Sequence, residues 1–217
     1  MTVGQVTARE ISAMKTSKIH WLGHASIRID GDKTIYIDPW KLKEDGPLAD
    51  IILITHSHYD HCSKNDVDRI RRDSTVVLAP PDCVESLPPG FFPVVPGMKK
   101  TIEGVVIRAV PAYNIGKSFH PRANDWVGYI IEMGEEKIYY TGDTDHIPEM
   151  DDIKADILIV PVGGTYTMTA DEAARSARVI NPRLAIPIHF GSVVGSRIDA
   201  EEFKRLAGVP VEILAEE

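Results

Sequence analysis

The stretch that most constrains this chain is residues 51–63, IILITHSHYDHCS, where an apolar run gives way to histidines and an aspartate. Branched apolar residues in such a run predict a buried strand, and the polar residues after it predict a loop at the strand's carboxyl end. Open α/β sheets place their sites at that end. His56, His58, Asp60 and His61 follow there, and imidazole and carboxylate groups suit zinc, iron, nickel or manganese. We therefore expect a metal centre on this loop, which can serve two adjacent metal sites.

The pattern His-x-His-x-Asp-His resembles the metal-binding signature of the metallo-β-lactamase superfamily. A polar loop that is rich in histidine by chance is the alternative, because a single histidine usually has a structural partner. Three further segments extend the resemblance: GHAS at 23–26, IDP at 37–39 and IHFG at 188–191. They are similar to the branch that holds L-ascorbate-6-phosphate lactonase and many uncharacterised metal-dependent hydrolases.

The resemblance implies six ligands for one or two divalent metal ions. The ligands implied for the first metal are His56 and His58. Those implied for the second metal are Asp60, His61 and His189. Asp143, in the segment YTGDTD, would lie between the two metals. Asp143 and His189 both follow predicted strands, although each alone also fits a structural role, as a turn residue and as a core histidine.

One ligand position departs from the family pattern. The superfamily usually carries a histidine in the middle of the chain, and here the corresponding segment is VPAYNIGKSFHP. Asn114 stands where the histidine is expected, and His120 follows six residues later. Either His120 serves the first metal or that site is incomplete. Asn114 can also orient water or a substrate oxygen through its amide.

His24 and Asp38 are expected to support the metal centre. The resemblance places His24 at the mouth of the site, where it would donate a proton, while a partly buried loop histidine is the alternative. Asp38 ends a predicted strand beside the motif strand, so we expect it to hold a ligand imidazole by its free N–H.

Two halves of the chain are similar in sequence. Residues 27–38, IRIDGDKTIYID, align with residues 130–141, IIEMGEEKIYYT, and residues 49–56 align with residues 155–162. Residues 76–80 align with 184–188 in the same order. We interpret this as a duplicated strand–strand–strand–helix–strand unit. Two such units packed sheet on sheet give the α/β fold that the resemblance implies, a four-layer αββα sandwich.

Length and composition bound the remaining expectations. The 217 residues suit one domain, 1–217, and the net charge of −8 argues against a nucleic-acid surface. No apolar run approaches the roughly 20 residues of a membrane span, and residues 1–15 lack the apolar core of a secretory signal. The two cysteines, Cys62 and Cys83, favour a cytoplasmic protein. The loop with Phe91 and Phe92 is a candidate homo-oligomer contact.

The predicted function is metal-assisted hydrolysis of a small anionic lactone, ester or phosphodiester. The metal would supply hydroxide near neutral pH, and Asp60 or Asp143 would take the proton. His24 or His120 would donate a proton to the leaving group. A nuclease that cleaves nucleic-acid phosphodiesters is one alternative, and a non-catalytic metal-binding protein is another.

Overall fold

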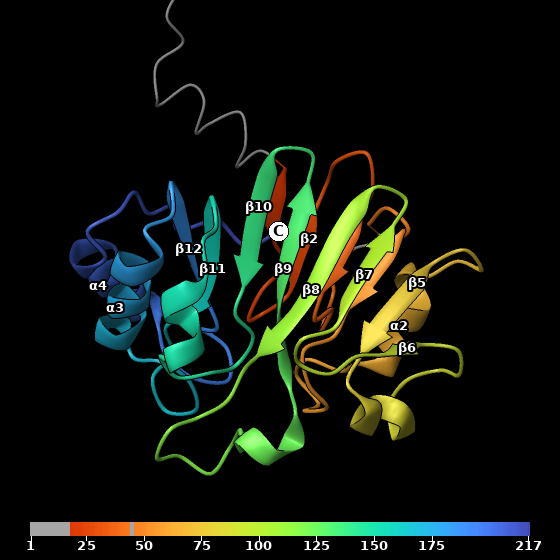
Figure 1. Ribbon diagram of the computed structural model, residues 1–217, viewed down its shortest axis with the longest axis horizontal. Coiled ribbons are helices and arrows are strands. Elements are labelled where there is room, and N and C mark those ends of the chain that lie inside the picture. Colours follow the sequence, from red (N-terminus) through yellow and green to blue (C-terminus); the bar gives the residue numbers. More distant parts are fainter. Residues whose placement is uncertain (1–17, 44–45) are drawn as a thin grey trace, which may run out of the picture.

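The computed structural model describes residues 18–43 and 46–217 and contains two six-stranded sheets. Figure 1 shows the second sheet in front of the first, with helices at the margins. The first sheet runs in the order β1 (Ile19–Trp21), β2 (Ile27–Ile29), β3 (Ile35–Ile37), β4 (Ile51–Leu53), β5 (Val76–Ala79) and β6 (Phe92–Pro93). The second runs in the order β12 (Leu184–Ile188), β11 (Ile157–Pro161), β10 (Glu136–Tyr140), β9 (Val127–Met133), β8 (Val105–Pro111) and β7 (Lys99–Ile102).

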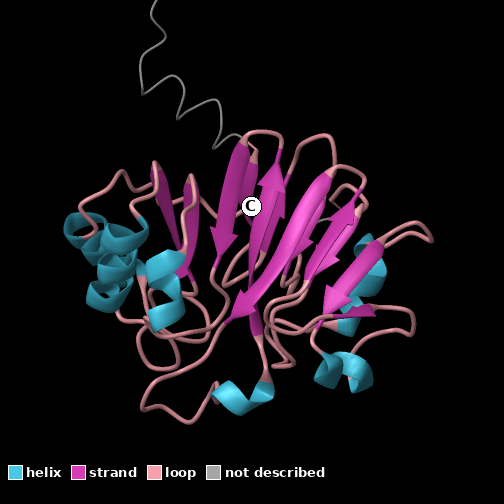
Figure 2. Cartoon of the chain, in the orientation of Figure 1, coloured by secondary structure: helices cyan, strands magenta, loops and turns pink. Residues whose placement is uncertain are grey.

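Within the described residues, three α-helices and three short 3-10 helices lie outside the sheets (Figure 2). The α-helices are α2 (Lys64–Ile70), α3 (Ala170–Ile180) and α4 (Arg197–Leu206). The 3-10 helices are Pro81–Glu85, Arg122–Asn124 and Pro148–Asp152. Helix α3 packs against β11 and α4, and α4 packs against β12. Two mixed sheets flanked by helices confirm the predicted α/β fold.

The core follows from the alternation of side chains along the strands. In β4, Ile51 and Leu53 belong to the large apolar cluster that joins the two sheets, whereas Ile52 packs on the opposite face with Val67 and Ile70 of α2. Strand β4 is therefore buried on both faces, which explains its unbroken apolar sequence. Its carboxyl end delivers the motif loop to the edge of the sandwich.

The two sheets contain the same strand arrangement, as the predicted duplication requires. Strands β3, β4 and β5 are parallel neighbours with Ile35 opposite Ile51 and Ile51 opposite Val76. Strands β10, β11 and β12 are parallel neighbours in the same way, and Ile157 is opposite both Ile138 and Leu184. These residue pairs are the ones that the sequence alignment of the halves matches.

Some boundaries differ from those that the sequence predicts. The last helix begins at Arg197, where Ser196 and Asp199 form a capping box in which Asp replaces the usual Glu. Phe92 lies in edge strand β6 rather than in a loop, and the amine of Lys100 lies over its ring. After α4, Val211 forms an isolated bridge with Ala185 of β12.

Candidate metal centre

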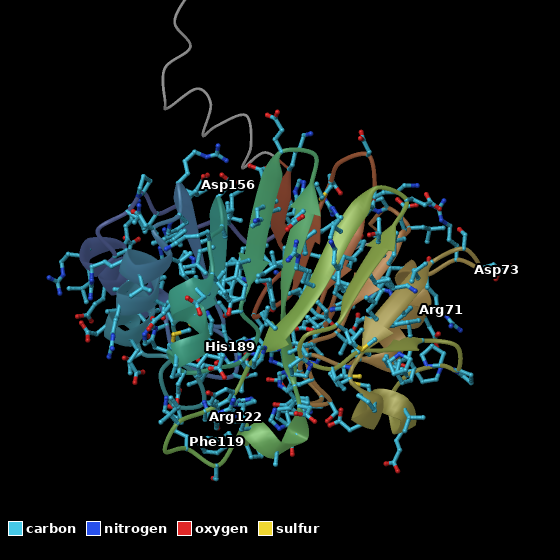
Figure 3. All side chains as sticks on the ribbon, in the orientation of Figure 1. Arg71, Asp73, Phe119, Arg122, Asp156 and His189 are labelled. Atoms are coloured by element: carbon cyan, nitrogen blue, oxygen red, sulfur yellow. The ribbon has the colours of Figure 1, made fainter. Side chains whose placement is uncertain are left out.

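Histidine and aspartate side chains from several loops meet at the carboxyl ends of the strands. Figure 3 shows His189 at this edge of the sandwich. Among the described residues, the ligand atoms fall into three groups, each with its atoms within 4.8 Å of one another. The groups are His56, His58 and His120; His24, Asp60, His61 and His189; and His56, His61 and Asp143. The first two groups are the two halves of a candidate metal centre, and the third joins them.

The first group is a triad of imidazoles directly after β4. Thr55 Oγ1 donates to Asp38 Oδ2 at 2.7 Å and lies 2.9 Å from His56 Nδ1, from which it accepts. His56 Nε2 is thereby left without a proton and lies 3.0 Å from Nδ1 of His58. His120 Nε2 is buried and has no hydrogen-bond partner. His58 Nδ1 therefore donates to His56 Nε2 in the metal-free chain, and three imidazole nitrogens converge here, which suits a metal with nitrogen ligands.

Asn114 stands behind His120 rather than in the triad. Its Nδ2 donates at 3.0 Å to two acceptors, Asp145 Oδ1 and the carbonyl of Tyr166. Its Oδ1 must therefore face His120, where it accepts from the backbone N–H at 3.0 Å and from Nδ1 at 3.1 Å. The amide is fully engaged and directs Nε2 of His120 toward the triad. The sequence left two alternatives, that His120 serves the first metal or that this site is incomplete. The geometry fits the first alternative.

Asp143 lies between the two groups. Its Oδ2 is 3.1 Å from Nε2 of His189, 3.3 Å from that of His120 and 3.4 Å from that of His61. All three nitrogens are buried and none has hydrogen-bond geometry to a partner. One carboxylate oxygen cannot give all three nitrogens good hydrogen-bond geometry, so their bonding capacity is only partly met. A metal on either side of Asp143 would satisfy them, and the donor set therefore fits a pair of ions.

Asp38 is fully buried and holds the imidazole of His61 in place. Its Oδ2 accepts from Nδ1 of His61 at 2.8 Å and from the hydroxyl of Tyr140 at 3.1 Å. Its Oδ1 accepts from the backbone N–H of Thr55 at 2.8 Å. With Nδ1 of His61 held in this way, Nε2 faces Asp143. The contact predicted between Asp38 and a ligand imidazole is present.

His24 lies within the second group. His24 follows Gly23, and the backbone φ of His24 is positive, at 48°. The carbonyl of His24 accepts from the backbone N–H of His189 at 2.8 Å and from Nε1 of Trp21 at 2.9 Å. Its Nε2 lies 3.1 Å from Asp60 Oδ2. The constrained backbone thus fixes the imidazole of His24 between the side chains of Asp60 and His189.

Burial and charge set the protonation of the cluster. Burial lowers the pKa of His56, His58 and His24, which keeps these rings neutral and able to bind metal. Burial alone would lower the pKa of His61, but the carboxylates of Asp143 and Asp38 raise it well above its usual value. Burial alone would raise the pKa of Asp143, but His189 and His61 hold it well below its usual value.

A pocket of about 230 Å³ opens onto the centre. Its lining residues are His58, Tyr59, Asp60, Phe119, His120, Asp143, Tyr166, His189 and Val193. Lys117, which flanks the ligand loop, donates to Asp145 and the carbonyl of Thr167. Arg122 pairs with Glu149. Neither cation lines the pocket.

Sequence reasoning missed four residues that hold the ligands in place. Thr55 and Tyr140 contact Asp38, and Asp145 orients Asn114. Trp126 lies under the imidazole triad, with its ring centroid 4.9 Å from that of His56, and donates from Nε1 to Asp82. Thr55 adjoins the motif and could have been found there. Tyr140 and Asp145 begin and end the segment YTGDTD that contains Asp143, so they too stood beside a predicted ligand. Trp126 carries no such signal.

Comparison with known proteins agrees with the fold and the motif. Residues 18–189 match the model of a β-lactamase superfamily domain. The chain belongs to the metallo-β-lactamase superfamily. A UPF0173 metal-dependent hydrolase of Thermoplasma acidophilum is 35% identical over 90% of this chain and 92% of its own length. One of Thermococcus onnurineus is 32% identical over 91% of this chain and 95% of its own length.

Two solved structures superpose over most of the chain. A protein assigned as a metal-dependent hydrolase from Parabacteroides distasonis has a TM-score of 0.83 at 32% identity, covering 92% of this chain and 93% of its own. Igni18, a metallo hydrolase from Ignicoccus hospitalis, has a TM-score of 0.72 at 22% identity, with 90% and 94% covered. The chain is thus a metal-dependent hydrolase of this superfamily. The narrower resemblance to the L-ascorbate-6-phosphate lactonase branch stays a prediction.

Some expectations concern other properties of the molecule. None of the helices in residues 18–43 and 46–217 has the length and hydrophobicity that a bilayer crossing requires. Cys62 and Cys83 are both buried and free. The segment 1–15, for which no secretory signal is predicted, lies outside the described residues. The cytoplasmic location, the single domain and the homo-oligomer stay predictions.

Proposed function

We propose that the chain binds two divalent metal ions and hydrolyses a small ester, lactone or phosphodiester. The observation that carries this proposal is the convergence of three partnerless buried nitrogens, from His61, His120 and His189, on one oxygen of Asp143. A hydrogen-bonded core histidine would not be left in this state. A pair of ions sharing Asp143 accounts for all three nitrogens at once.

The residues divide into two ligand sets that share one carboxylate. The proposed ligands are His56, His58 and His120 for the first ion, Asp60, His61 and His189 for the second, and Asp143 for both. Zinc, manganese, iron and nickel all suit such nitrogen and oxygen donors. When bound, the ions lower the pKa of water and polarise the reacting carbonyl or phosphoryl oxygen.

In this proposal Asp60 accepts a proton from the attacking water, and His24 positions Asp60. Asp60 lines the pocket, and its Oδ2 is held by Nε2 of His24. Its other oxygen, Oδ1, would then both hold the second ion and accept the proton of the attacking water. His24 positions Asp60, and the hydrogen bond from His24 lowers the pKa of Asp60 against the effect of burial, which keeps the carboxylate ionised.

The pocket limits the substrate to a small molecule. Its volume of about 230 Å³ lies below the roughly 300–1,000 Å³ that hold drug-sized ligands. The sequence predicts an anionic substrate. Because Lys117 and Arg122 are engaged by Asp145 and Glu149, neutralising such a charge would fall to the metal ions. The small pocket and the net charge of −8 disfavour the nuclease alternative.

Hydrolysis of a panel of activated esters, lactones and phosphodiesters tests the proposal. We expect metal-dependent turnover that falls at least about 100-fold in His58→Ala, because the triad loses a ligand. His20→Ala is the matched control, since His20 lies in β1 and contacts Asp30 and Glu217 instead. Full turnover by His58→Ala would refute the assignment. Metal binding without turnover of any substrate would favour the non-catalytic alternative.

A further inference from the structure

Apolar side chains surround the opening of the metal centre. We define the apolar wall as Tyr59, Phe119, Tyr166 and Val193, which all line the pocket. Figure 3 shows Phe119 at the edge of the molecule that carries His189. Tyr59 is 68% exposed and Phe119 is 42% exposed. Aromatic rings left this open at a pocket mouth are typical of surfaces that bury a ligand.

The wall is built from the same loops as the ligands. Tyr59 stands between His58 and Asp60, and Phe119 directly precedes His120. Val193 lies in the loop that follows His189. A group attached to a molecule reacting at the metals would contact the wall, because the wall residues line the same pocket as the ligands.

Two aromatic pairs hold opposite parts of the wall. The rings of Phe119 and Tyr166 meet edge to face, with centroids 4.7 Å apart and planes at 89°. The ring of Tyr59 meets that of Trp40 with centroids 5.8 Å apart and planes at 75°. Such pairs reduce the freedom of exposed rings. The wall is thus a preformed apolar surface.

The pocket offers no cationic side chain beside the metal centre. Its two carboxylates, Asp60 and Asp143, are proposed metal ligands, and none of the lining residues in the described part of the chain is a lysine or an arginine. The nearby amine of Lys117 is taken up by Asp145, at 2.5 Å. A carboxylate or phosphate on the outer part of a substrate would therefore lie against aromatic rings without a cationic partner, at the cost of its hydration.

We infer that the substrate is an uncharged carboxylic ester or lactone whose substituent is aromatic or branched and apolar. This rests on the proposed function and adds the substrate class. In the reaction, water adds its oxygen to the carbonyl carbon and the carbon–oxygen bond to the alkoxy group breaks. One proton of water goes to the leaving oxygen and the other leaves the new acid. The products are one carboxylate and one alcohol or phenol.

A matched pair of esters tests the inference: 4-acetoxybenzamide, which is neutral, and 4-acetoxybenzoate, which is anionic and nearly the same size. With the metal-loaded full chain, we expect kcat/KM to be at least about tenfold higher for the amide. We expect Phe119→Ala and Tyr59→Ala to reduce this ratio, mainly by raising KM for the amide. Ile198→Ala is the control, because Ile198 is 76% exposed on α4 and is not a pocket residue.

The outcomes separate this inference from the proposed function. Metal-dependent turnover with a ratio near one, or in favour of the benzoate, overturns the inference and leaves the hydrolase proposal standing. If neither ester is turned over, saturation-transfer NMR with the product phenols decides. Stronger binding of 4-hydroxybenzamide that weakens in Phe119→Ala supports the inference, and equal or stronger binding of 4-hydroxybenzoate overturns it. Absence of bound metal in the wild-type chain would count against the proposed function itself.

Discussion

At the residue scale, hydrogen bonds behind the ligands decide which nitrogen of each imidazole faces the metal. Thr55 accepts from Nδ1 of His56, Asn114 accepts from Nδ1 of His120, and Asp38 accepts from Nδ1 of His61. Each contact turns Nε2 toward the centre. Partners of this kind fix the tautomer and orientation of a ligand histidine and contribute to metal affinity.

We predict that Asn114→Leu weakens metal binding at the first site by about 10–100-fold. Leucine is similar in size, but it removes the acceptor for Nδ1 of His120 and the donor to Asp145. Titration of the metal-free variant with zinc, followed by calorimetry, measures the change. Asn65→Leu on the exposed face of α2 is the control. An affinity equal to that of the wild type would contradict the role of Asn114.

The raised pKa of His61 predicts that metal affinity depends on pH. Because Asp143 and Asp38 outweigh burial and raise this pKa, the metal-free protein holds a proton on His61 near neutral pH. Metal must displace that proton, so affinity rises with pH until the raised pKa is passed, by about tenfold per pH unit for each proton displaced. Competition with a chelating dye between about pH 6 and pH 8 checks the slope. Asp38→Asn should flatten it, and an equal slope in that variant would argue against the coupling.

At the element scale, the duplicated unit was predictable because it rests on local patterns. Apolar runs ending in polar residues predicted β4 and β11, and the aligned halves predicted how their neighbours pair. Ser63 caps α2, and its side chain accepts from the backbone N–H of Asp66. Edge strand β6 was missed because its pairing depends on β5 and not on its own Pro-rich sequence.

The capping box of α3 gives a stability prediction at this scale. Thr169 Oγ1 accepts from the backbone N–H of Glu172, and Glu172 accepts from that of Thr169. We expect Thr169→Ala to lower the free energy of unfolding by about 1 kcal/mol, with metal content unchanged. Urea unfolding measures this, and Thr165→Ala, in the preceding exposed turn, is the control. Equal midpoints for the variant and the wild type would show that the box adds nothing.

At the scale of the whole molecule, both halves contribute to the centre. The first half supplies the motif loop and Asp38, while the second supplies His120, Asp143 and His189. The hydroxyl of Tyr140 crosses from the second sheet to Asp38 in the first, over a sequence separation of 102 residues. The motif ligands were predictable from their spacing. The place of His120 was not, because it depends on contacts of Asn114 with residues that lie more than 30 positions away.

Metal should therefore stabilise the fold as a whole. Ions that bind the native chain and not the unfolded one add about 2.7 kcal/mol at a concentration of 100 times Kd. We expect a chelator to lower the thermal midpoint, and added metal to restore it. The same treatment of His61→Ala should have a smaller effect. A midpoint that does not respond to the chelator in the wild type would contradict a metal centre shared by both halves.

The number of metal ions per chain tests the two-metal centre most directly. Elemental analysis of the purified wild type, His120→Ala and the control His20→Ala gives this number. The structure predicts about two ions per chain in the wild type and the control, and about one in His120→Ala, because the first triad loses its third nitrogen. A single ion in the wild type that persists unchanged in His120→Ala would contradict the assignment of His120 and, with it, the two-metal centre.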